Sequence, residues 1–87
     1  MVKASIVVMN KSGLHMRPAS LLAGIAAKLR SEITIVAGDK QIDPKSVLLL
    51  MSAGITYGTE IEIVCDGDSE KEDLQTMLDA ISSGLGE

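Results

Sequence analysis

The only histidine of the chain, His15, lies in the segment GLHMRPA at positions 13–19. A neutral imidazole is a nucleophile near pH 7, so a histidine can take up a phosphoryl group on a ring nitrogen. Pro18 is typical of the first turn of a helix, where its missing N–H is not needed. His15 therefore stands directly before a predicted helix that begins at Met16 or Arg17.

The start of that helix is suited to an anion, because its first N–H groups have no partner inside the helix and carry partial positive charge. A phosphoryl group on His15 would meet the N–H groups of Met16 and Arg17 and the guanidinium of Arg17. No second base, acid or metal ligand lies close in the sequence, which disfavours a hydrolase or another complete enzyme. From the residues alone, an ordinary surface histidine remains the alternative.

Charge is distributed unevenly along the 87 residues, whose net charge is −4. Residues 1–46 hold seven Lys or Arg and three Asp or Glu, whereas residues 47–87 hold one Lys and nine Asp or Glu. The basic half contains His15 and favours an incoming anion or an acidic partner. The negative total and the single aromatic residue, Tyr57, disfavour nucleic acid as a partner.

The composition also narrows the class of protein. Cys65 is the only cysteine, so it cannot form an intrachain disulfide, and its place in an alternating pattern predicts a small buried side chain. The cysteine and histidine count favours neither a metal site nor a bound cofactor. With no apolar run of membrane length and no apolar leader pattern, we expect a cytoplasmic protein without membrane insertion.

Hydrophobic periodicity predicts the order β-α-β-β-α-β-α. The expected strands span residues 3–8, 32–37, 40–42 and 60–66, and the expected helices start near residue 16, at residue 47 and after residue 69. Inward positions share an apolar character: Ala4, Ile6, Val8, Leu22, Ile25, Ala26, Leu29, Ile33, Ile35, Ile61, Ile63, Cys65, Leu74, Met77, Leu78 and Ile81. This pattern predicts an α+β fold in a single domain, residues 1–87, with helices on one face of a sheet and the other face solvated.

Helix boundaries are also indicated by residue type. Ser46 stands where an N-cap is expected, and Gly54 is placed to end the helix over residues 47–52. The pattern Ser69-x-x-Glu72 predicts a capping box for the last helix, which Gly84 would terminate.

The chain resembles the HPr family, the histidine-containing phosphocarriers of the bacterial phosphoenolpyruvate:sugar phosphotransferase system. The resemblance covers about residues 2–83 and rests on GLHMRPA at 13–19, KSV at 45–47 and MSAGI at 51–55. It implies an open-faced β-sandwich, with a four-stranded antiparallel sheet of order 1-4-2-3 and three helices on one face. It also implies a monomeric phosphocarrier, not an autonomous catalyst.

The resemblance assigns roles to particular residues. His15 would accept phosphate at Nδ1 from phosphorylated enzyme I and donate it to enzyme IIA components of sugar permeases. Met16, Arg17 and Pro18 would form the phosphate site. Ser46 matches the serine that an ATP-dependent HPr kinase/phosphorylase modifies in Gram-positive members, in carbon catabolite control through a transcriptional regulator; the residues alone indicate only an N-cap.

A run of five apolar residues, 47–51, follows Ser46. Only about half of a helix of this kind can face inward, so we expect part of the run to be exposed near the histidine. A partner-docking surface is predicted from Ser20, Val47, Leu48, Leu49 and Met51, and a fully buried helix is the alternative.

Four positions depart from the commonest family pattern: Met16, Gly24, Ala27 and Leu49. They bear on which partners bind and how tightly. Two alternatives stay open. One is a carrier for another branch, in nitrogen-related signalling or dihydroxyacetone phosphorylation. The other is a mainly regulatory protein phosphorylated on Ser46, although paralogues of that kind lack the active histidine that is present here.

Overall fold

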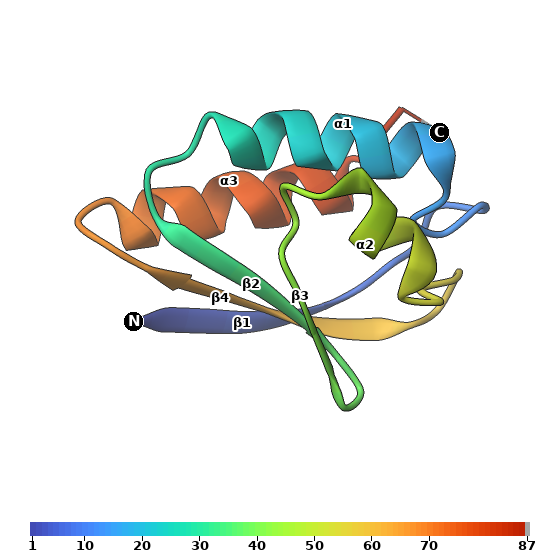
Figure 1. Cartoon of the computed structure of the whole chain (residues 1–87), viewed down its shortest axis with the longest axis horizontal. Coiled ribbons are helices and arrows are strands. Elements are labelled where there is room, and N and C mark those ends of the chain that lie inside the picture. The colour runs from blue at the N-terminus through green and yellow to red at the C-terminus, as the bar shows by residue number, and fades with distance from the viewer. Residues whose placement is uncertain (87) are drawn as a thin grey trace.

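Four strands form one antiparallel sheet, and three helices cover one face of it (Figure 1). The computed structural model describes residues 1–86. In chain order the elements are β1 (Val2–Val7), α1 (Met16–Ala27), β2 (Glu32–Ala37), β3 (Lys40–Ile42), α2 (Val47–Ser52), β4 (Glu60–Asp66) and α3 (Glu70–Ser82). The strand order is β1-β4-β2-β3, which confirms the predicted α+β fold and its 1-4-2-3 sheet.

The alternation of side chains along the strands builds the core. In β4 the residues Ile61, Ile63 and Cys65 are buried, and β4 pairs with β1 on one side and β2 on the other. Ile63 therefore lies opposite Ala4 in β1 and Ile35 in β2. Burial raises the pKa of the Cys65 thiol, as expected for the predicted small buried side chain.

The helices complete this core with small and branched aliphatic side chains. In α1 the buried residues include Leu22, Ala23 and Ala26, and in α3 they include Met77 and Ile81. Figure 1 shows α1 and α3 running side by side over the sheet, with α2 beside α1. The opposite face is the solvated one that the strand pattern predicted, with Lys3, Ser5 and Glu60 exposed and Thr34 and Glu62 half-buried.

Three boundaries differ from prediction by one or two residues, and one of them is the start of β1, at Val2 instead of Lys3. The first strand ends at Val7 because Val8 bonds to a loop, accepting from the Gly58 N–H and donating to the Thr59 carbonyl. Helix α1 ends at Ala27, so Leu29, which was predicted to continue its apolar stripe, packs half-buried against the core from beyond the helix. The bond from Leu29 N–H to the Ala26 carbonyl tightens this last turn.

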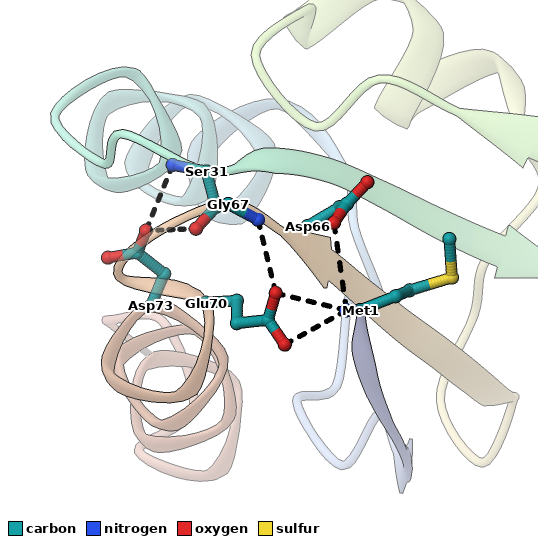
Figure 2. Close-up of polar contacts among 6 residues, drawn as sticks. All are labelled: Met1, Ser31, Asp66, Gly67, Glu70 and Asp73. Atoms are coloured by element: carbon teal, nitrogen blue, oxygen red, sulfur yellow. Dashed lines mark hydrogen bonds and ion pairs between the residues drawn. The ribbon is translucent and has the colours of Figure 1, made fainter.

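The predicted capping box at the start of α3 is wrong. The Ser69 side chain makes no capping bond; its Oγ donates to Asp73 Oδ2 at 2.8 Å. Asp73 is buried and accepts two further bonds at Oδ2, from Ser31 N at 2.9 Å and Ser31 Oγ at 2.5 Å (Figure 2). A buried carboxylate needs several hydrogen-bond donors, so the Ser69 hydroxyl donates to Asp73 instead of capping the helix.

A second carboxylate at the same end ties β1 to α3. Glu70 accepts from the Met1 ammonium at 3.0 Å and from the Gly67 N–H at 3.3 Å, and the ammonium lies 3.6 Å from Asp66 (Figure 2). These bonds lower the pKa of Glu70 and raise that of the Met1 ammonium. The acidic start of α3 is therefore used within the fold.

The Asp73 cluster predicts acid sensitivity. Hydrogen bonds, above all from the Ser31 side chain, hold the pKa of Asp73 below its ordinary 3.8. A carboxyl whose pKa is lower in the folded state stabilises the fold above pH 4 and loses that contribution as pH falls. We expect Asp73→Asn to lower the free energy of unfolding by about 1–3 kcal/mol at pH 7 and to flatten its fall between pH 5 and pH 2. Urea denaturation at several pH values measures both effects. Ser31→Ala should flatten the slope in part; an unchanged slope in Asp73→Asn would contradict this account.

Candidate functional site

His15 is the N-cap residue of α1. Its backbone is extended, with φ −86° and ψ −166°, and its carbonyl accepts from the Ala19 N–H at 2.8 Å. The imidazole is exposed and makes no capping hydrogen bond. The backbone of His15 is thus part of the helix start, while its ring is presented to solvent.

The residues on each side of His15 hold it between two buried points. Leu14 before it is buried in the core, and Pro18 three residues later is fully buried in the first turn of α1. Met16 and Arg17 lie between them and are exposed, Met16 by 65%. The first turn of the helix uses neither of their N–H groups, and Pro18 has none to offer. Pro18 fixes the conformation of this turn, because its ring restricts φ and is buried.

The loop before His15 is held against the loop between α2 and β4. Gly13 has φ +62°, and a Cβ at this position would collide with the Ile55 carbonyl oxygen and lie 2.6 Å from Thr56 Cα. The next N–H, that of Leu14, donates to the Ile55 carbonyl at 3.0 Å. Glycine is therefore required here by both its backbone conformation and the close approach.

The partner loop is braced from within. Thr59 Oγ1 accepts from the Thr56 N–H at 3.1 Å, and the Gly58 N–H donates to the Val8 carbonyl at 2.7 Å. No role for residues 56–59 was predicted from the sequence. Gly58, with φ +85°, and the two threonines three positions apart are local signs of a closed turn. The bonds that this loop makes to residues 8–14 depend on the fold.

Ser46 caps α2, as the sequence predicted. Its Oγ accepts from the Leu49 N–H at 3.2 Å, and its carbonyl accepts from the Leu50 N–H at 3.1 Å. Ser46 is half-buried, and the helix ends at Ser52 before Gly54, which has φ +73°. The predicted terminator glycine is thus confirmed.

Helix α2 packs against α1 and buries only one of its apolar side chains completely, Leu50. Leu48 is 76% exposed and Leu49 45%, while Val47 and Met51 are half-buried. The fully buried helix considered as an alternative is therefore wrong. Ser20 is exposed on α1.

Among residues 1–86 no three His, Cys, Asp or Glu side chains gather in a way that could hold a metal ion. No helix of this part of the chain is long and apolar enough to cross a bilayer.

Known proteins are similar to this chain in both sequence and fold. Residues 2–83 match the family described as the PTS HPr component phosphorylation site. The phosphocarrier protein HPr of Mycoplasma capricolum is 45% identical over 83 residues, covering 91% of this chain and 93% of its own. That of Neisseria meningitidis serogroup A is 34% identical over 87 residues, covering 100% and 98%. The crystal structure of HPr from Thermoanaerobacter tengcongensis superposes with a TM-score of 0.94 at 36% identity, covering 100% of this chain and 98% of its own.

The match over residues 2–83 and the similarity to the curated relatives identify the chain as a phosphoryl carrier and not an autonomous catalyst. The chain belongs to the HPr family of the phosphotransferase system. It is a phosphocarrier of that system, and membership implies enzyme I and enzyme IIA as partners.

The Gly13 contact predicts a large effect from one methyl group. Gly13→Ala should lower the free energy of unfolding by at least about 1–2 kcal/mol, the cost of the left-handed backbone, before the collision with Ile55 is added. Gly24 is the matched control, because it lies within α1 with no neighbour of its Cβ position within 4 Å. Gly24→Ala should stabilise the protein by about 0.5–1 kcal/mol. Thermal and urea unfolding measure both; equal stabilities of the two variants would refute the close approach.

Proposed function

We propose that His15 carries the phosphoryl group of this phosphocarrier. It accepts the group at Nδ1 from phosphorylated enzyme I and passes it to an enzyme IIA component. In the first step the bond between His15 Nδ1 and phosphorus forms as the donor's bond to that phosphorus breaks. In the second step the bond to His15 breaks as the acceptor's bond to the phosphorus forms, so neither step needs an oxidant or reductant. The observation that carries the proposal is the exposed ring of the only histidine at the N-cap of α1.

The helix start and Arg17 are proposed to hold the phosphoryl oxygens. The N–H groups of Met16 and Arg17 supply donors and partial positive charge, and the exposed Arg17 guanidinium supplies a full charge. Pro18 keeps the first turn in helical conformation, so the donors are in place before the group arrives.

We propose a docking surface made of Ser20, Val47, Leu48, Leu49 and Met51. Two exposed leucines on a short helix beside α1 are costly in water and favour a protein partner. Leu50 anchors the helix in the core, Val47 and Met51 pack half-buried against that core, and Leu48 and Leu49 remain on the surface. On this surface enzyme I and enzyme IIA would dock. We also propose that residues 1–87 form one domain and act as a cytoplasmic monomer.

Ser46 is proposed as a regulatory phosphorylation site, served by an HPr kinase/phosphorylase and read by a catabolite-control transcriptional regulator. Support comes from its place at the edge of the docking surface, next to Val47. A phosphate there adds about −1.5 to −2 charges, and at an N-cap the helix dipole favours that charge. The modification would therefore leave α2 folded and alter what docks on it.

The proposed carrier residue can be tested by labelling. Incubation with enzyme I and phosphoenolpyruvate should label the protein with acid-labile, base-stable phosphate, and His15→Ala should abolish the label. Because the ring is exposed and makes no capping bond, the variant should keep the unfolding temperature of the original protein. Label retained in a folded His15→Ala would exclude His15 as the carrier.

The proposed regulatory role of Ser46 can be tested by a charge substitution. Ser46→Asp should slow phosphoryl transfer from enzyme I several-fold, because the added charge must be desolvated or repelled when a partner covers α2. Its unfolding temperature should stay close to that of the original protein, since Asp is also a good N-cap. Ser5→Asp makes the same charge change on the exposed sheet face and serves as control. Equal rates for the two variants would count against the docking surface.

A further inference from the structure

Asn10 is a polar residue buried in the turn that leads to His15. It is 4% exposed, and its backbone carbonyl accepts from the Gly13 N–H at 3.0 Å. Its side-chain Nδ2 donates to the Gly13 carbonyl oxygen. One residue thus binds both polar backbone groups of Gly13.

The other side-chain atom of Asn10 marks this arrangement as more than packing. Oδ1 is buried and has no hydrogen-bond partner among residues 1–86. The amide cannot reverse to relieve this, because the Gly13 carbonyl can only accept a bond and must face Nδ2. A buried acceptor without a partner opposes folding. What Asn10 contributes to the protein therefore comes from the hydrogen bond that its Nδ2 donates to the Gly13 carbonyl.

That donor holds one end of the Gly13–Leu14 peptide group. The carbonyl of this peptide group is bound by Asn10, and its N–H is bound by the Ile55 carbonyl at 3.0 Å. Glycine has the widest choice of backbone conformations, so a peptide group next to it turns over more readily than others. Bonds at both ends fix its orientation one residue before His15.

A flip of this peptide group would displace the imidazole of His15. It would release the Leu14 N–H from Ile55 and redirect the chain where His15 begins α1. Such a change would shift the His15 imidazole relative to the N–H groups of Met16 and Arg17. Phosphoryl transfer depends on the placement of the nucleophile and the anion donors, and a displacement of 1 Å can cost about a hundredfold in rate.

We infer that Asn10 is a positioning residue for phosphoryl transfer, acting through the Gly13–Leu14 peptide group on His15. The inference rests on the proposed role of His15. It assigns to Asn10 an effect on the rate of the chemical step, not on partner binding, because Asn10 is buried and lies outside the docking surface.

The test is the steady-state transfer of phosphate from enzyme I to Asn10→Ala, well below its unfolding temperature. We expect kcat to fall roughly ten- to a hundredfold while KM for the carrier stays within about twofold. Amide hydrogen exchange at Leu14 should become faster, since its bond to Ile55 is loosened. Ile63→Val, a core truncation in β4 away from the turn, is the control and should keep the original kcat.

A second variant keeps the test decisive if Asn10→Ala fails to fold. Asn10→Asp has nearly the same shape, and its ionised carboxylate cannot donate to Gly13, whereas the protonated form can. Its kcat relative to the original protein should be low at neutral pH and rise as pH is lowered. The inference is overturned if either variant, folded and at neutral pH, has the kcat of the unsubstituted protein, or if Ile63→Val loses as much kcat as the Asn10 variants. Absence of label on His15 in the original protein would instead overturn the proposed function.

Discussion

The backbone contact between Gly13–Leu14 and Ile55 is the constraint on which the site depends. It brings the loop after β1 against the loop before β4, two segments that are about forty residues apart in sequence. Only a glycine permits this approach, and the adjoining Leu14 N–H uses the same Ile55 carbonyl. The start of α1, and with it the direction of His15, is set by this contact and by the burial of Leu14 and Pro18 on either side.

Around His15, the buried residues that hold the helices in place differ from the residues that are exposed at the surface. Leu50 and Pro18 are buried and hold α2 and α1 in place, while Leu48, His15 and Arg17 remain at the surface. This arrangement suits the proposed role of His15, since the proposed carrier residue lies at the start of a rigid helix and is still accessible. Ser46 is half-buried, so its hydroxyl can cap α2 while the residue also borders the proposed docking surface.

Much of the fold could be predicted because it follows from local pattern. Alternation placed Ile61, Ile63 and Cys65 inward, and Ser46 and Gly54 marked the ends of α2. The predicted capping box at Ser69 is wrong for a physical reason. Asp73 is buried beside Ser31, which is distant in sequence, and its carboxylate accepts hydrogen bonds from both the Ser31 and the Ser69 hydroxyl groups. The role of residues 55–59 was missed because it consists of backbone bonds to residues 8–14, which no side-chain pattern encodes.

The sequence by itself determined the elements, the inward faces, the family and the identity of the one histidine. These depend on side-chain type and on spacing along a helix or strand, which are local properties. Only the tertiary structure decided which loops meet, which residues of the 47–51 run are exposed, and that Asn10 grips the peptide group before His15. Such facts arise where segments distant in sequence approach, because hydrogen bonds and steric fit between them depend on positions that the whole fold sets.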